Sequence, residues 1–542
     1  MTGLRRLFLP PAGLVLAVLF VCPLAIIAAY SVLSRGAYGG VEPPWTLENW
    51  VRVADPLYVR IFGRSVLLAG AATLICLAAG FPLALFISRS GPRRNLYLAL
   101  VMLPFWTSFL VRTYSWLFLL RETGLFNTLL LASGLIREPL PLLYSDGAVI
   151  LGLVYGYLPF MVLPLYAALE RIDRSLLEAA ADLGARPLSV LFRVVVPLAA
   201  PGAAAGSLLV FIPCLGAYLT PDLMGGGKTI MIGTLVQNQF TTARDWPFGA
   251  ALSLALMGLI AALLGAGLAR SRSSMPGGPA AMESPPRTGN SLPLAGYAAA
   301  AFAFLYLPLA ALAVFSFNSS RFTVWEGFSL RWYAAAFGDP QLMEAAWNSL
   351  AIALSATAAA TAAGALCAYA LWKRRSPAIT GALYATLVTP EIVMGVALLA
   401  FFQWTFRFLD VRLGMHTVIL AHVAFSIAYV VLVVGARLRT LDARLEEAAL
   451  DLGANPWQAF CQVTLPAILP AVGAAALLAF TVSFDDYVIT SLVAGVDSET
   501  LPMVIYAMAR RGANPVVNAV SSLIVAGFGA LILISERLRR SA

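Results

Sequence analysis

Four carboxylates stand out because they fall within or at the edge of long apolar runs. They are Asp222, Glu391, Asp485 and Asp486. A charged side chain at membrane depth is costly to bury and usually marks a function. Three aromatic residues lie at comparable positions along these runs, namely Trp106, Tyr218 and Tyr487. Because acidic groups and aromatic faces together bind organic cations, we interpret this set as a candidate path for a cationic amine.

A structural interpretation of the same four carboxylates stays open. An aspartate can cap the end of a broken helix or pair with a nearby arginine. Helices this apolar show no periodicity that separates pore-facing from lipid-facing sides. The sequence therefore favours neither interpretation for any single carboxylate.

Other residue types that could carry chemistry lack the required spacing. The five cysteines are irregularly spaced and mostly lie in apolar runs, which indicates small core residues rather than disulfides. His416 and His422 are six residues apart, which is not metal-ligand spacing. The segment 225–229 (GGGKT) resembles the end of a phosphate-binding loop, but Asp222 stands where that motif needs its first glycine. We therefore expect no metal, no cofactor and no catalytic residue in this chain.

A polar segment occurs twice, at a constant offset of 269 residues. Glu178, Ala179, Ala180, Asp182, Gly184 and Pro187 recur as Glu447, Ala448, Ala449, Asp451, Gly453 and Pro456. An internal repeat of this kind indicates two copies of one architecture. We call residues 170–198 the first repeat loop and residues 437–468 the second repeat loop.

Each repeat loop is predicted to be an amphipathic helix–Gly–helix elbow outside the bilayer. Asp173 or Ser175 can cap its first helix, and Ser175 with Glu178 fits a capping box. Asp442 offers the same cap in the second copy. The glycine of each copy suits a left-handed helix end, and the following proline suits the first turn of a second short helix.

The Glu-Ala-Ala pattern, followed after three residues by Gly, resembles the signature loop of permease subunits in binding-protein-dependent ABC importers. The resemblance implies that both repeat loops are cytoplasmic coupling loops. It also implies two copies of an ABC ATPase subunit that bind them, and a periplasmic or lipid-anchored binding protein that delivers a small-molecule substrate. ATP hydrolysis would then belong to a separate chain, so this chain is not expected to be an enzyme.

Composition places the chain in a bilayer. Of its 542 residues, 60% are hydrophobic and 12% are charged, about half the charged fraction of a soluble protein. Many apolar runs are long enough to cross a bilayer. We predict an all-α polytopic membrane protein with about twelve transmembrane helices, arranged as two parallel six-helix repeats. With the resemblance above, this is the type I ABC importer permease fold.

The predicted spans divide the chain into a first half (1–269), a cytoplasmic linker (270–292) rich in Arg, Ser, Pro and Gly, and a second half (293–542). In the first half the spans lie near 10–33, 63–88, 96–120, 146–169, 199–222 and 247–269. In the second half they lie near 294–317, 346–372, 379–405, 415–436, 469–494 and 516–535.

Basic residues set the expected orientation. The net charge is +9, and the Lys and Arg residues cluster in short loops on one side, which the positive-inside rule explains better than nucleic-acid binding does. Both termini, the linker and both repeat loops are predicted to be cytoplasmic, in a bacterial inner membrane. The longer loops near 34–62 and 318–345 would lie outside.

Two further stretches narrow the resemblance to a substrate class. Residues 216–226 resemble the first permease of the spermidine/putrescine branch, and residues 483–487 with 499–515 resemble its second permease. This implies a polyamine or related organic cation. Because fused permeases also occur in iron(III) and thiamine importers, these substrates remain alternatives. A secondary transporter of the six-plus-six type is an alternative class of protein, although a transporter of that class has no need for the duplicated loop.

Overall fold

The computed structural model describes residues 10–105, 107–271, 292–321, 324–409, 411–442, 444–512 and 514–541. Within these ranges, nine helices are long and apolar enough to cross a membrane. In the first half they are Pro10–Tyr30 (which ends in α2, Cys22–Tyr30), α4 (Pro56–Ser88), α8 (Asp146–Glu170), α10–α11 (Pro187–Leu215) and α14 (Trp246–Ser271). In the second half they are α15 (Leu292–Phe315), α17 (Pro340–Lys373), α20 (Met415–Leu438) and α22–α23 (Pro456–Asp485). The prediction of a polytopic helical membrane protein is confirmed.

The three other predicted spans are occupied by broken or shorter helices. The third is divided into α5 (Arg94–Met102) and α6 (Phe109–Leu120), and the ninth is a pair, α18 (Pro377–Val388) and α19 (Glu391–Leu409), bent by 112°. The twelfth is α26 (Pro515–Ser541), with Pro515–Ala530 as its apolar part. Each of the ranges 96–120 and 379–405, which were predicted as single spans, contains two helices. The breaks contain Pro104 and Pro390, which lack the N–H that a continuing helix uses.

The fifth and eleventh spans also differ from the predicted ranges of 199–222 and 469–494. Their helices begin at Pro187 and Pro456, so the second short helix expected in each elbow is the start of the spanning helix itself. A π-helical segment, Leu191–Val195 or Phe460–Thr464, joins the two parts. Each spanning helix ends early, and a short helix follows the break, α12 (Leu219–Gly225) or α24 (Val488–Val493).

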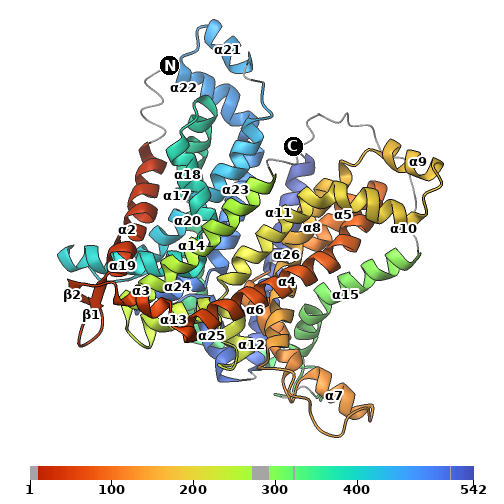
Figure 1. The fold of residues 1–542 in the computed structure, drawn as a ribbon, viewed down its shortest axis with the longest axis vertical. Coiled ribbons are helices and arrows are strands. Elements are labelled where there is room, and N and C mark those ends of the chain that lie inside the picture. The colour runs from red at the N-terminus through yellow and green to blue at the C-terminus, as the bar shows by residue number, and fades with distance from the viewer. Residues whose placement is uncertain are drawn as a thin grey trace.

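The two halves repeat the same order of elements. The starts of α8 and α20, of α10 and α22, of α12 and α24, and of α14 and α26 all differ by the 269 residues found in the loop sequences. The same offset relates α13 (Ile232–Thr241) to α25 (Leu501–Arg511). The first half has one additional helix, α7 (Leu125–Ala132), at the end of the molecule opposite the repeat loops (Figure 1).

The first helix of each half packs against helices of the other half. α2 packs against α19, and α15 packs against α4 and α6. Tyrosine hydroxyls fix α15 in place by donating to backbone carbonyls of the first half: Tyr297 to Ala79 (2.7 Å) and Tyr306 to Leu100 (2.8 Å). From the first half, the Tyr155 hydroxyl donates to the Leu305 carbonyl (2.8 Å). The halves therefore form one membrane unit.

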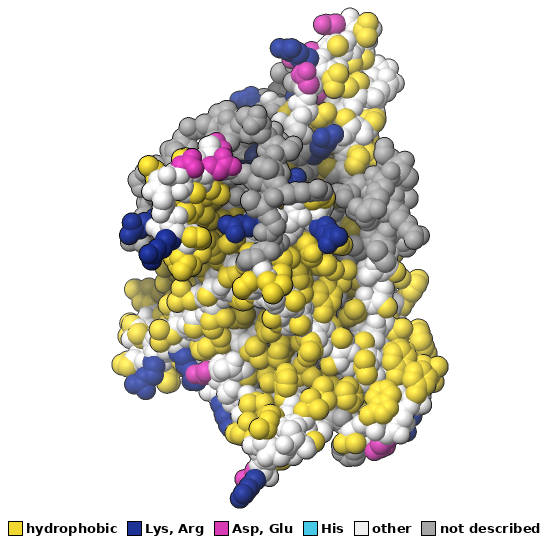
Figure 2. Space-filling view, turned by 90° about the vertical axis from the view of Figure 1, so that its right-hand side faces the viewer, with side chains coloured by type: hydrophobic (Ala, Val, Ile, Leu, Met, Phe, Trp, Pro, Cys, Tyr) yellow, Lys and Arg dark blue, Asp and Glu magenta, His cyan; other side chains and the backbone are white. Residues whose placement is uncertain are grey.

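The predicted outer loops contain small ordered elements. In the first half these are a two-stranded antiparallel sheet, β1 (Leu33–Arg35) and β2 (Val41–Trp45), and the short helix α3 (Glu48–Val53). In the second half, α16 (Arg331–Gly338) follows an isolated bridge between Asn318 and Phe328. On the face shown in Figure 2, a broad band of hydrophobic side chains lies between two charged ends, as a bilayer requires. Residues 272–291 of the predicted linker lie outside the described residues.

Candidate functional site

The two repeat loops have matching local structures. The first helices are α9 (Arg174–Asp182) and α21 (Arg444–Asp451). Each is followed by a glycine in the left-handed region, Gly184 with φ +77° and Gly453 with φ +93°. Asp173 is the N-cap of α9 and accepts from the Ser175 N–H (3.0 Å), so the expected capping role of Ser175 is corrected. Asp442 accepts from the Arg444 N–H (3.0 Å) in the same way.

The shared Glu, Ala, Asp and Gly residues of the loops have the same exposure in both copies, whereas Pro187 is exposed and Pro456 is half-buried. The exposed ones are Glu178, Ala179, Asp182, Gly184, Glu447, Ala448, Asp451 and Gly453, whereas Ala180 and Ala449 are half-buried. Pro187 and Pro456 occupy the first turn of the spanning helices. Leu183 and Leu452, at equivalent positions, are 88% and 89% exposed. Both loops lie at the same end of the molecule (Figure 1). Paired apolar side chains in two exposed loops indicate a surface that a partner covers.

A cavity of about 270 Å³ lies where the broken helices of the two halves meet. Its walls come from α6 and α8 of the first half, from α20 of the second half, and from the breaks after α11, α18 and α23. Five of the seven predicted path residues line it: Tyr218, Glu391, Asp485, Asp486 and Tyr487. Trp106 lies outside the described residues. Asp222 is not among the lining residues and lies beside the cavity instead.

Glu391 and Asp485 line the cavity, and each has a carboxylate oxygen without a hydrogen-bond partner among the described residues. Glu391 is the first residue of α19, at the 112° bend, and its side chain is exposed with no hydrogen-bond or ion-pair partner among the described residues. The helix dipole of α19 favours a negative charge at this position. Asp485 accepts from the Phe109 N–H (2.7 Å) through Oδ2, which joins the end of α23 to the start of α6. Its Oδ1 is buried without a partner in the described part of the chain.

Asp486 is satisfied within the protein. Its Oδ2 accepts from the N–H and the Oγ1 of Thr490, both at 2.7 Å, and lies 3.4 Å from His422 Nε2. His422, on α20, is buried and contacts Ser483 Oγ (2.7 Å) and Thr490 Oγ1 (2.9 Å). The structural interpretation of a cap therefore describes Asp486, and His422 holds α23 and α24 together across their break.

Arg112 is a cavity residue that the sequence interpretation missed. It is buried on α6, donates to the Gly156 carbonyl (3.1 Å), and lies 5.3 Å from the centre of the Phe109 ring. The rule that found the carboxylates could have found it, since it is a charge within an apolar run. Three carboxylates and one guanidinium line the described cavity, so its wall carries a net charge of about −2 when all four are ionised.

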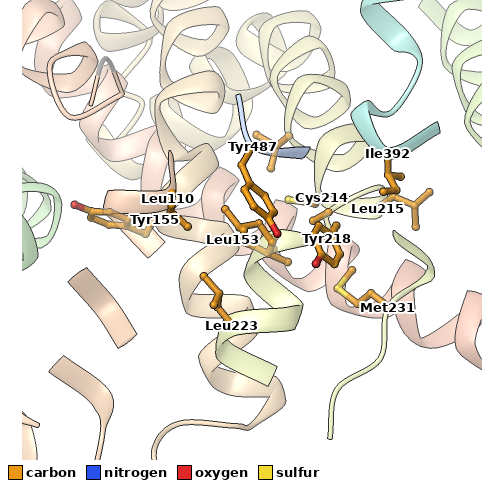
Figure 3. Close-up of a cluster of buried hydrophobic side chains, with 14 of the residues drawn as sticks. Leu110, Leu153, Tyr155, Cys214, Leu215, Tyr218, Leu223, Met231, Ile392 and Tyr487 are labelled. Atoms are coloured by element: carbon orange, nitrogen blue, oxygen red, sulfur yellow. The ribbon is translucent and has the colours of Figure 1, made fainter. Parts of the chain in front are cut away.

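Three tyrosines, one from the first half and two from the second, contact one another beside the cavity. The rings of Tyr218 and Tyr487 are stacked at 6.3 Å with an interplanar angle of 11° (Figure 3), and Tyr506 stacks on Tyr487 at 4.3 Å. The hydroxyls of Tyr218 and Tyr506 are 3.1 Å apart, and Tyr506 donates to Asp222. Arg510 lies 3.9 Å from the Asp222 carboxylate. We call these five residues the tyrosine cluster.

The tyrosine cluster lies on the side of the cavity away from the repeat loops. α8 ends at Glu170, just before the first loop, so its start at Asp146 marks the opposite end of the molecule. The Tyr144 N–H donates to the Met224 carbonyl (2.9 Å), which places α12, and with it Asp222, toward that opposite end. The cluster thus joins the two halves between the cavity and the end of the molecule opposite the repeat loops.

Two interlocked halves of six predicted spans each, with a charged cavity between them and paired loops at one end, define a membrane permease. Residues 62–272 and 360–540 match the family described as binding-protein-dependent transport system inner membrane component. The chain belongs to this family. Membership favours the importer permease over the secondary-transporter alternative.

The chain is similar to polyamine permeases. It is 43% identical over 243 residues to the spermidine/putrescine transport system permease protein PotB of Haemophilus influenzae, which covers 45% of this chain and 85% of that protein. It is 43% identical over 235 residues to the putrescine transport system permease protein PotI of Escherichia coli, covering 42% of this chain and 84% of PotI. A solved bacterial ABC transporter that imports alginate is 18% identical, with a TM-score of 0.38 and coverage of 43% of this chain and 85% of that one.

Proposed function

We propose that this chain forms the transmembrane path of an ATP-driven importer for polyamines, with both permease halves in one polypeptide. The observation that carries the proposal is the cavity between the halves, which Glu391 and Asp485 line together with aromatic side chains. Relatives named for spermidine and putrescine transport support the same substrate class.

The charge of the cavity suits a diamine. Ammonium groups bind carboxylates by charge-assisted hydrogen bonds and bind aromatic faces by cation–π contact. The wall's net charge of about −2 would be neutralised by a protonated diamine such as putrescine. The buried guanidinium of Arg112 offsets one carboxylate, so the site does not demand a more highly charged cation.

We propose a different partner protein for each end of the molecule. Two copies of an ABC ATPase subunit would bind the repeat loops on the cytoplasmic side, where we place both termini and the linker. A periplasmic or lipid-anchored binding protein would deliver substrate at the opposite end. Closure of the ATPases on ATP would move the loops, and through α10–α11 and α22–α23 it would move the breaks that line the cavity.

Uptake by a reconstituted assembly tests the proposed substrate. The chain, its ATPase and its binding protein are placed in proteoliposomes and supplied with ATP and labelled putrescine, spermidine, thiamine or ferric ion. We expect ATP-dependent uptake of putrescine or spermidine that unlabelled thiamine and ferric ion do not inhibit. Uptake of thiamine or ferric ion with no uptake of either polyamine would contradict the proposal.

The tyrosine cluster would close the path on the outer side. Replacing Tyr506 with Phe keeps the ring stack but removes the hydroxyl that joins Tyr218 and Asp222. A hydrogen bond to a charged group is worth about 1.5–3 kcal/mol. We expect the outward-open state to become easier to reach and ATP hydrolysis without binding protein to rise severalfold. The matched control is Tyr297→Phe, which removes a hydroxyl contact between the halves away from the cavity. An equal rise in both variants would contradict a specific role for the cluster.

A further inference from the structure

The second repeat loop is attached to the membrane helices by a buried carboxylate. Glu446 directly precedes the repeated Glu447 and is only 4% exposed, although most residues of its helix are exposed. Its Oε1 accepts from the Tyr369 hydroxyl (2.7 Å) and from Lys373 Nζ (3.0 Å). Its Oε2 accepts from Thr464 Oγ1 (2.9 Å). The Glu446 carboxylate therefore accepts from three side-chain donors.

The three donors belong to two different spanning helices. Tyr369 and Lys373 lie in the last turns of α17, which ends at Lys373. Thr464 ends the π-helical segment that leads into α23. Glu446 thus joins α21 to both α17 and α23, and α23 carries Asp485 at its far end.

The first half keeps only one polar counterpart of this network, Arg89, which corresponds to Lys373. The residue equivalent to Glu446 is Leu177, and the residue equivalent to Thr464 is Val195, each 269 positions earlier. In α4, where Ser65 matches Ser349 of α17, Leu85 corresponds to Tyr369. Leu85 and Val195 are buried, and Leu177 packs against the same hydrophobic core. Apolar contact has no preferred direction, whereas a carboxylate with three donors fixes the relative positions of the helices.

We propose that Glu446 is a positioning residue that transmits movement of the second repeat loop to α17 and α23. This inference rests on the proposed function of the loops as ATPase-binding sites. Because a buried charge must keep its partners, α21 moves together with the ends of both spanning helices. In the first half, apolar residues replace the carboxylate and two of its three donors, so we expect the two halves to respond differently to the same ATPase movement.

Two measurements test this role. The first is putrescine transported per ATP hydrolysed by the full assembly in proteoliposomes, for wild type, Glu446→Gln and Glu446→Leu. The matched control is Asp245→Asn, another buried carboxylate paired with a cation, Arg52 (3.0 Å), but far from the loops. The second is the distance distribution between spin labels at Leu452→Cys and Arg375→Cys in the purified chain, with Cys22 and Cys461 replaced by Ser. This distance measurement does not depend on transport activity.

We expect Glu446→Leu to lower the transport per ATP at least fivefold and Glu446→Gln about twofold, with both ATPase subunits still bound. Asp245→Asn should keep the wild-type ratio. The spin-label distribution should broaden in Glu446→Leu. An unchanged ratio, an unchanged distribution, or loss of the ATPase subunits from the variant would overturn the inference. If the wild-type assembly itself shows no ATP-driven uptake, the proposed function fails, and the spin-label result then decides separately whether Glu446 holds the loop.

Discussion

Replacing Glu391 with Gln is expected to reduce putrescine uptake about 10- to 100-fold. Glu391 is the one cavity carboxylate with no partner among the described residues, so its charge is available to an ammonium group. A charge-assisted hydrogen bond of this kind is worth about 1.5–3 kcal/mol. Asp485→Asn should have a similar effect, because Asp485 lines the cavity and its Oδ1 has no hydrogen-bond partner among the described residues. The measurement is the initial rate of ATP-dependent uptake in proteoliposomes.

Two controls separate substrate binding from folding in this experiment. Glu391→Asp keeps the charge and should restore part of the uptake. Asp146→Asn removes a carboxylate that pairs with Arg64 at the outer end and does not line the cavity, so uptake should stay near wild type. Wild-type uptake in both Glu391→Gln and Asp485→Asn would exclude these carboxylates from the path.

Replacing Gly184 or Gly453 with Val is expected to abolish most uptake while the protein still inserts into the membrane. Both glycines have a left-handed backbone, and a β-branched residue in that region is strained by at least about 1–2 kcal/mol. Apart from the adjacent residues, an added Cβ would meet no atom of the described part of the chain within 4 Å, so the expected effect comes from the backbone conformation. The strain should displace the loop and uncouple transport from ATP hydrolysis, so that ATP is hydrolysed with little uptake. Uptake and ATP hydrolysis are measured together.

Asparagine at the same positions gives the matched control, because it adopts the left-handed conformation readily. Gly184→Asn and Gly453→Asn should retain most of the uptake. Normal uptake in both valine variants would count against a coupling role for the loops.

The repeat loops were predictable because their signals are local. A helix cap, an alanine-rich turn, a glycine and a proline follow one another within about fifteen residues, and Gly184 and Gly453 have the left-handed conformation that this pattern predicts. The broken helices were predictable only in part. Pro104 and Pro390 are visible breakers, but the ends at Leu215 and Asp485 precede breaks that contain no proline.

The roles of the carboxylates depended on contacts that the sequence does not show. Asp485 and Asp486 are adjacent in sequence and both line the cavity, yet Asp485 keeps an oxygen without a partner among the described residues, whereas Asp486 is held by His422 from a different helix. Asp222 is satisfied by Tyr506, which is 284 residues away. The rule of rare charges in apolar runs therefore led to residues that line one cavity, and tertiary contacts then separated the carboxylates that are fully paired from those that are not.

The most direct test of the account is the mass of the assembly purified with its ATPase. The chain is co-expressed with that subunit, extracted in mild detergent and weighed by native mass spectrometry. We predict one permease chain of 57.6 kDa with two ATPase chains, one for each repeat loop. A complex with two permease chains, or a permease that binds no ATPase in any nucleotide state, would contradict the claim that one chain supplies both halves of the importer.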